Sequence, residues 1–145
     1  MSDVLSLSQI RMPGTARSKD EAIREAGEIL VDAGAVTPAY IDSMFDRERS
    51  VSTYMGNYLA IPHGTNEAKE SIKRSALSVI RYTEPIDWDG NEVLFALGIA
   101  GYQGGHMDIL SRIAIVFSDT DEVDKLLAAG SAEELYRLLH DVNAD

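Results

Sequence analysis

One histidine of this chain stands between a residue that restricts the backbone and one that frees it, in Pro62-His63-Gly64. The apolar run 58–61 before it predicts a strand that stops at Pro62, because proline has no N–H for a ladder and holds the preceding residue extended. Gly64 permits positive φ or a close approach of the backbone to a ligand. Imidazole has the side-chain pKa nearest neutrality, so His63 could act as an acid, base or nucleophile. Packing of His63 at the strand end is the alternative from these residues alone.

Phosphoryl transfer is a chemistry that such a segment can support. It needs an accessible nucleophile and charge compensation around the phosphoryl oxygens. His63 can serve if one ring nitrogen offers its lone pair while an acceptor holds the other; the sequence leaves open which nitrogen attacks. Backbone N–H groups of Gly64 and Thr65 could meet phosphoryl oxygens, as in nest-like turns. We expect the Thr65 hydroxyl to cap the helical turn that follows.

Arg47 has a planar guanidinium that keeps its charge and suits bidentate phosphate contact, so it could supply a countercharge. It lies near the C-terminal end of a predicted helix, and from these residues alone it is interpreted as a surface arginine that interacts with the helix dipole. Arg49 is the second candidate. Two residues apart on a helix, Arg47 and Arg49 cannot share a face.

His106 is the other candidate histidine. It follows Gly104-Gly105 and opens a predicted helix that has apolar residues at Met107, Leu110 and Ile113. The positive end of a helix dipole favours a neutral imidazole, which could donate an N–H to a phosphoryl oxygen. A helix cap or a packing residue is the structural alternative. His140, near the end of the last predicted helix, is interpreted as solvated surface.

Composition limits the classes of function. The chain has 145 residues with 13 basic and 24 acidic side chains, a formal net charge of −11, and no cysteine. This charge argues against general nucleic-acid binding and against an anionic membrane surface. The lack of cysteine excludes a disulfide framework and a thiolate catalyst, and it is compatible with a reducing cytoplasm. No apolar run approaches membrane-spanning length. The length predicts a single domain over residues 1–145.

Helix and strand signals alternate along the chain. Ser18 and Ser131 each begin a capping-box pattern, Gly34 closes the first helix, and Thr37-Pro38 predicts the start of a second. Further helices are expected from near Met107 and within the acidic segment 119–124. Strands are predicted at 77–82 and 93–100, with turn formers between 85 and 91. The pattern predicts an α/β sandwich, a mixed β-sheet flanked by helices on both faces.

Two stretches, Asp46-Arg47-Glu48 and 52–65, resemble the mannitol-type (mannitol/fructose family) enzyme IIA of the bacterial phosphoenolpyruvate-dependent sugar phosphotransferase system. Residues 19–23 resemble the start of that family's first long helix, and Gly105-His106-Met107 resembles its second histidine region. The resemblance therefore extends from about residue 5 to about residue 139. Family members often carry polar or acidic residues where this chain has Gly104-Gly105, which leaves the placement of His106 open.

The resemblance implies a phosphocarrier. His63 would accept a phosphoryl group from the protein HPr and pass it to a cysteine of enzyme IIB, with Arg47 and His106 in support and no metal or other cofactor. The membrane component IIC would set the sugar, with mannitol expected and fructose or another polyol as alternatives. We expect a cytoplasmic subunit that docks its partners through an apolar patch around His63, including Met55 and Tyr58.

Two other functions are weighed against the phosphocarrier. One is a regulatory module of the same fold, whose histidine phosphorylation is read by a regulator or transporter. The other is a metal-dependent hydrolase using His63, His106 and a carboxylate. The lack of a His-x-His or HExxH spacing counts against the hydrolase.

Overall fold

The computed structural model describes residues 4–140, with residues 66, 67, 104 and 106 described only in their backbone. The strands are β1 (Ile10–Arg11), β2 (Tyr54–Gly56), β3 (Leu59–Ala60), β4 (Ala76–Trp88) and β5 (Asn91–Ala100). The α-helices are α1 (Lys19–Asp32), α2 (Ala39–Ser50), α3 (His106–Phe117), α4 (Thr120–Ala128) and α5 (Ala132–Leu139). Short 3-10 helices are η1 (Leu7–Gln9), η2 (Asn66–Ser71) and η3 (Tyr102–Gly104).

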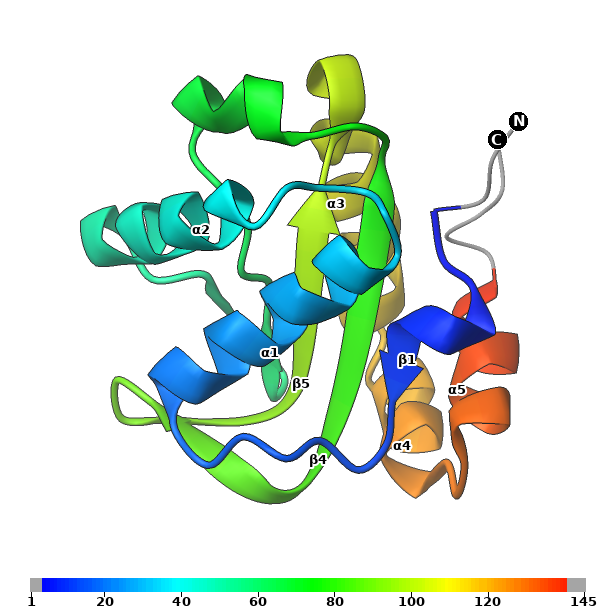
Figure 1. Cartoon of the computed structure of the whole chain (residues 1–145). Helices are drawn as coiled ribbons and strands as arrows, with labels where there is room; N and C mark the ends of the chain where they lie inside the picture. The colour runs from blue at the N-terminus through cyan, green and yellow to red at the C-terminus, as the bar shows by residue number, and fades with distance from the viewer. Residues whose placement is uncertain (1–3, 141–145) are drawn as a thin grey trace.

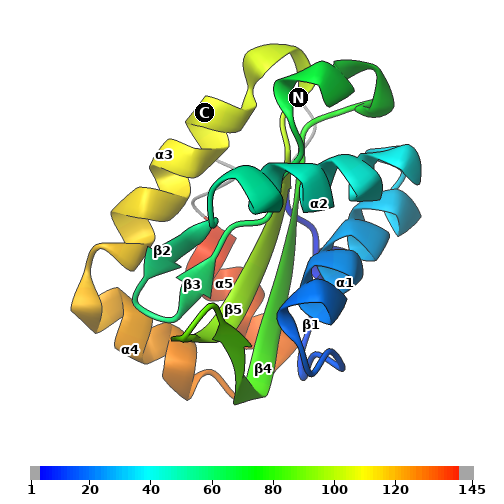
Figure 2. The same cartoon turned by 90° about the vertical axis from the view of Figure 1, so that its left-hand side faces the viewer.

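The strands form a five-stranded sheet in the order β1-β4-β5-β3-β2. β1 runs parallel to β4 and β3 parallel to β5, whereas β4–β5 and β2–β3 are antiparallel. The sheet is therefore mixed, as predicted. The long β4–β5 hairpin forms its centre, and the short hairpin β2–β3 lies at one edge (Figures 1 and 2).

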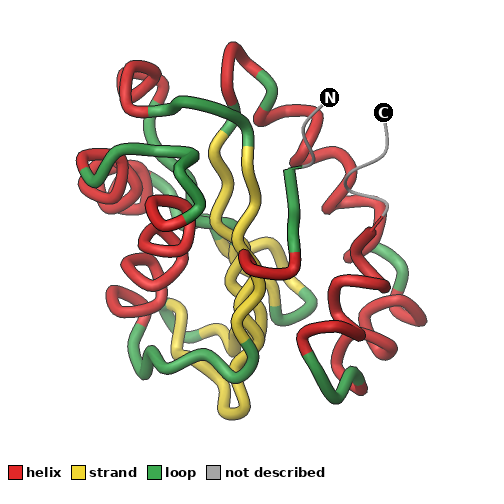
Figure 3. Tube along the Cα trace, turned by 45° about the vertical axis from the view of Figure 1, so that its right-hand side comes forward, coloured by secondary structure: helices red, strands yellow, loops and turns green. Residues whose placement is uncertain are grey.

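Helices cover both faces of the sheet, which confirms the predicted sandwich (Figures 1 and 3). α1 and α2 pack on one face over a buried cluster that includes Ile80 and Trp88. α3, α4 and α5 pack on the other face over a cluster that includes Leu97 and Ile99. No helix in the described range is long and apolar enough to cross a membrane.

Short polar side chains begin the predicted helices. The Ser18 hydroxyl accepts from the Glu21 N–H at 3.2 Å, and the Ser131 hydroxyl accepts from the Glu134 N–H at 3.1 Å. The acidic segment holds α4, with the Asp119 carboxylate accepting from the Asp121 N–H at 2.9 Å. Each contact satisfies an N–H that a helix start otherwise leaves without a partner. These predicted helix starts are confirmed.

The turn expected within 85–91 is present but shorter than that range, because β4 continues through Trp88. The pairing register shifts between Arg81 and Ile86, so Pro85 lies where its missing N–H costs no ladder bond. The chain turns only at Asp89 and Gly90, which have φ of 55° and 94°. Positive φ at both positions is typical of a two-residue hairpin turn.

Candidate functional site

His63 follows β3, three residues after its last residue, and lies beside Ile99 near the C-terminal end of β5. The Pro62 carbonyl accepts from the Ile99 N–H at 3.0 Å, and His63 forms an isolated parallel bridge with Ile99 of β5. The imidazole is half-buried. The prediction that a strand delivers this histidine to its own end is confirmed.

One hydrogen bond fixes the tautomer of the neutral His63 ring. Nδ1 lies 2.8 Å from the carbonyl oxygen of Ile61. A carbonyl oxygen can only accept, so Nδ1 carries the proton and the lone pair of the neutral ring is on Nε2. The sequence left open which nitrogen offers its lone pair, and in this tautomer it is Nε2.

The segment after His63 is held by Tyr40 of α2. The Gly64 N–H donates to the Tyr40 hydroxyl at 2.8 Å, and that hydroxyl donates to the Ile99 carbonyl at 2.7 Å. Burial raises the pKa of Tyr40, and the Gly64 bond lowers it by less. The hydroxyl is therefore a neutral bridge. The prediction that the Gly64 N–H serves phosphoryl oxygens is wrong, because Tyr40 already accepts it.

Thr65 does stand at the N-cap of η2, but its side chain makes no capping hydrogen bond there. Its backbone carbonyl instead accepts from the Ala68 N–H at 3.1 Å. The prediction of a capping hydroxyl is wrong. A 3-10 turn of this kind closes through the backbone alone.

Arg47 lies on the face of α2 that faces the His63 segment. Tyr40, Ser43 and Arg47 are spaced at i, i+3 and i+7, which places them on one helix face. A Cβ built on Gly64 would lie 2.4 Å from Ser43 Oγ and 2.5 Å from Tyr40 Cε1, so this face packs directly on the residue after His63. Arg47 is half-buried, and its guanidinium donates to the Val51 carbonyl at 2.8 Å.

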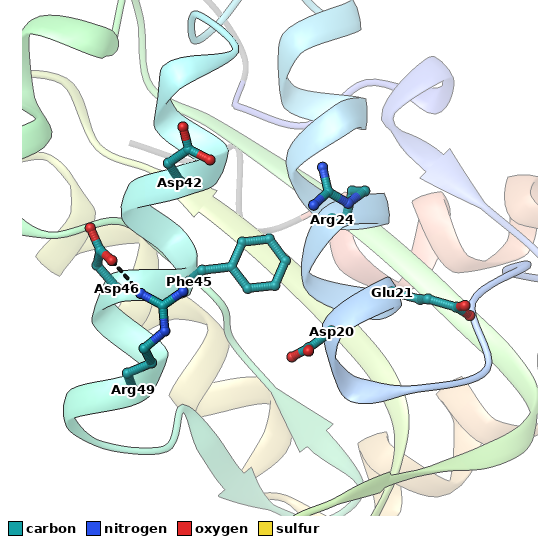
Figure 4. Close-up of a pocket in the computed structure, with 7 residues that line it drawn as sticks. All are labelled: Asp20, Glu21, Arg24, Asp42, Phe45, Asp46 and Arg49. Carbon is teal, nitrogen blue, oxygen red and sulfur yellow. Dashed lines mark hydrogen bonds and ion pairs between the residues drawn. The ribbon is translucent and has the colours of Figure 1, made fainter.

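Arg49 lies on a different side of the helix. Its guanidinium pairs with the Asp46 carboxylate at 2.6 Å, and both side chains are largely exposed. They line a cavity of about 530 Å³ between α1 and α2. Figure 4 shows this cavity with Phe45 at its centre and Arg24 above the Phe45 ring, 5.4 Å from the ring centroid. Its lining residues come from α1 and α2 and include none of the His63 segment.

His106 is the first residue of α3, as predicted, and Gly105 stands at the N-cap. β3 and β5 are parallel, so the segments that follow them, which lead to His63 and His106, leave the sheet at the same edge. The side chain of His106 lies outside the described residues. His140 is exposed, as expected. No group of three or more His, Asp or Glu side chains among the described residues could hold a metal ion.

Tyr40 is a site residue that the sequence did not indicate. An aromatic residue on an amphipathic helix reads as core, and Tyr40 is indeed buried at 2% exposure. The two residues that its hydroxyl contacts, Gly64 and Ile99, are 24 and 59 positions away in the sequence. In the sequence, the only signal that links Tyr40 to the candidate site is its position seven residues before Arg47, on the same helix face.

Comparison with known proteins places this geometry in a family. Residues 3–142 match the family model for the phosphoenolpyruvate-dependent sugar phosphotransferase system, EIIA 2. The chain is 52% identical over 140 residues to a mannitol-specific phosphotransferase enzyme IIA component of Halalkalibacterium halodurans, covering 97% of each.

Solved structures agree with the sequence comparison. The fold superposes on enzyme IIA in the solution structure of the Escherichia coli mannitol IIA–phosphorylated IIB complex with a TM-score of 0.87, 31% identity and coverage of 94% of this chain and 96% of that one. It superposes on the crystal structure of E. coli IIA mannitol with a TM-score of 0.86, 32% identity and coverage of 93% and 98%. With a histidine presented at the end of a parallel strand, this chain belongs to the EIIA type 2 family of the phosphoenolpyruvate-dependent sugar phosphotransferase system.

Proposed function

We propose that this chain is a cytoplasmic, mannitol-specific enzyme IIA whose residues 1–145 form one domain. His63 accepts a phosphoryl group from phosphorylated HPr and passes it to a cysteine of enzyme IIB, which serves the uptake and phosphorylation of the sugar by IIC. Two similar proteins support the choice of sugar and partner: the relative from H. halodurans is a mannitol-specific enzyme IIA component, and the E. coli neighbour was solved in complex with phosphorylated IIB.

The observation that carries the proposal is the bond from His63 Nδ1 to the Ile61 carbonyl. It leaves the lone pair on Nε2, which attacks the phosphorus of phosphorylated HPr. The bond from phosphorus to the HPr nitrogen breaks as the P–Nε2 bond forms. In the second step a thiolate of IIB attacks phosphorus and the P–Nε2 bond breaks, returning the lone pair to Nε2. Positioning and charge compensation supply most of the catalysis in such transfers.

Arg47 and His106 support the transfer in this proposal. Arg47 shares a helix face with Tyr40 and Ser43, which pack on Gly64, so its charge lies on the His63 side of α2. A guanidinium there would stabilise negative charge on the phosphoryl oxygens. His106 opens α3 at the sheet edge where His63 also lies, and a neutral imidazole there would donate one N–H to the same oxygens.

Exposed apolar side chains in the segment between α2 and His63 form the proposed docking surface. Met55 and Tyr58, in the β2–β3 hairpin, are 49% and 39% exposed, and Val51 is 63% exposed. The hairpin is tied to α3, because the Asn57 side-chain amide donates to the Phe117 carbonyl at 2.7 Å. HPr and IIB would bury these side chains when they dock on the segment that leads to His63. The net charge of −11 would attract basic partner surfaces, so association should weaken as salt rises.

A reconstituted relay tests the proposal. Phosphoenolpyruvate, enzyme I and HPr should label the chain, and the label should reach a mannitol-type IIB faster than a fructose-type IIB. A label accepted and not passed to either IIB would favour the regulatory alternative. Equal transfer to both would overturn the choice of mannitol, and no label at all would overturn the phosphocarrier.

A further inference from the structure

Glu48, the residue after Arg47, is a carboxylate with only 6% of its surface exposed. It lies in the last turn of α2, where the negative end of the helix dipole disfavours an anion. A buried carboxylate at this position requires donors, and three reach it. Thr53 donates through its N–H at 2.8 Å and its hydroxyl at 2.5 Å, and Trp88 donates through Nε1 at 3.1 Å. The Lys19 ammonium lies 3.6 Å away.

Thr53 connects Glu48 to the His63 imidazole. The carbonyl of Thr53, the residue that Glu48 holds, accepts from the Ile61 N–H at 3.0 Å. The Ile61 carbonyl in turn accepts from His63 Nδ1 at 2.8 Å. The Ile61 carbonyl, which sets the His63 tautomer, therefore belongs to a residue that is hydrogen-bonded to Thr53, and Glu48 holds Thr53 in place.

The loop that Thr53 belongs to also contacts Arg47. Its guanidinium donates to the Val51 carbonyl at 2.8 Å, and Val51 lies two residues before Thr53 in the loop between α2 and β2. Val51 is 63% exposed, so few packing contacts hold it in place. Two buried hydrogen bonds from Thr53 to Glu48 attach this loop to the core.

We infer that Glu48 is a positioning residue for phosphoryl transfer: its carboxylate fixes the 51–53 loop and thereby aligns the His63 imidazole and the Arg47 guanidinium. This inference rests on the proposed function. Glu48 does not touch the phosphoryl group; it determines how well the groups that do so are aligned. Its removal should lower the rate of the transfer step and leave partner docking unchanged.

A comparison of two buried carboxylates tests this. Glu25 of α1 is 4% exposed and accepts from Arg11, Thr15 and Tyr82, which lie outside the His63 segment. We expect Glu48→Ala to slow single-turnover transfer from the phosphorylated chain to IIB by between about tenfold and about a hundredfold, the loss typical of displaced reactive groups. Glu25→Ala should lower stability but keep the rate within about twofold, because sites without shared partners act independently.

Two readouts separate positioning from general stability. The concentration of IIB at half-maximal rate should stay unchanged in Glu48→Ala while the maximal rate falls. The ¹⁵N spectrum of unphosphorylated His63 should show the Nδ1–H tautomer in the wild type and in Glu25→Ala, and a mixture of both tautomers in Glu48→Ala. Glu48→Gln should recover most of the rate, because its carbonyl can accept from the Thr53 N–H and its amide can donate to the Thr53 hydroxyl.

If Glu48→Ala does not fold, Thr53→Val tests the same inference. It removes the bond from the Thr53 hydroxyl to Glu48, keeps the bond from the Thr53 N–H, and preserves the shape of the side chain. It should lower the transfer rate and alter the tautomer in the same direction, to a smaller extent. Wild-type rates and tautomers in the folded variants would overturn the inference. That outcome is distinct from failure of the proposed function, in which the wild-type chain itself would take no label from HPr.

Discussion

The hydroxyl of Tyr40 lies 2.8 Å from the Gly64 nitrogen and bridges it to the Ile99 carbonyl, 2.7 Å away on the other side. Since the Ile99 N–H also donates to the Pro62 carbonyl, the residues on both sides of His63 are fastened to one residue of β5. The histidine is thus held by a central strand of the sheet although it lies in a loop.

Replacing Tyr40 by Phe should weaken this bridge without disturbing the packing of the ring. The Gly64 N–H and the Ile99 carbonyl would lose their partner, and a buried polar group left without one costs about 1–3 kcal/mol. Urea unfolding measures this loss. Tyr58→Phe is the control, because Tyr58 is 39% exposed and a surface change of this kind stays within about 0.5 kcal/mol. Equal midpoints for the two variants would show that the bridge contributes nothing.

Gly64→Ala should misplace His63, because the new methyl group would lie 2.4 Å from Ser43 Oγ and 2.5 Å from the Tyr40 ring. Either the α2 face or the histidine segment must move. We expect transfer to IIB to fall by about a hundredfold, as for an ångström-scale displacement of a reacting group. Gly130→Ala, where a Cβ would meet nothing within 4 Å, should transfer normally. If Gly64→Ala is as active as Gly130→Ala, the close packing of Tyr40 on this segment is unimportant for transfer.

The two neighbouring arginines of α2 should differ in their effects. Arg47→Ala should slow transfer by about two orders of magnitude, or about 3 kcal/mol, the usual contribution of one placed electrostatic contact. Arg47→Lys should recover only part, since an ammonium lacks the guanidinium fork. Arg49→Ala removes the same charge but breaks only an exposed pair with Asp46, so its rate should match the wild type. Single-turnover rates that are equal for Arg47→Ala and Arg49→Ala would contradict the assignment of Arg47.

Glu25 should make folding sensitive to acid. Burial would raise its pKa, but hydrogen bonds from Thr15, Arg11 and Tyr82 outweigh burial and lower the pKa from 4.5 to about 2. The stabilisation is complete above pH 4.5 and is lost as the pH falls from 4.5 towards 2. At one pKa unit per 1.4 kcal/mol, it amounts to about 3 kcal/mol.

Glu25→Gln should flatten that dependence, because an amide does not titrate. The free energy of unfolding, measured in urea between pH 2 and 6, should fall less steeply with acid in the variant than in the wild type. Parallel curves for the two proteins would mean that Glu25 is not the group that responds.

The features predicted from the sequence are those that depend on neighbours in the chain. Ser18 and Ser131 cap helices through residues three positions on, and β3 ends at Ala60, two residues before Pro62. The extent of β4 was not predictable in this way, because Pro85 is tolerated only through a register shift against β5. The two-residue strand β1 owes its existence to β4, with Ile10 paired to Val79.

The site residues also differ in whether the sequence alone could indicate them. His63 and Gly64 were identified from their types and order, and the resemblance added Arg47 and His106. Tyr40 was missed because its partners Gly64 and Ile99 lie across the fold. Glu48 was missed because its link to His63 runs through the hydrogen bonds of Thr53 and Ile61, which the sequence does not reveal. The tautomer of His63 was equally out of reach, because it depends on how the ring turns back towards the Ile61 carbonyl.

The most direct measurement is the position of the phosphoryl group itself. After incubation with phosphoenolpyruvate, enzyme I and HPr, the ¹⁵N-labelled chain should show phosphorus coupled to Nε2 of His63 and to no other ring nitrogen. His63→Ala should take no phosphoryl group, while His140→Ala, which alters an exposed histidine, should take it normally. Phosphorus on Nδ1 of His63, or full phosphorylation of His63→Ala, would contradict the account.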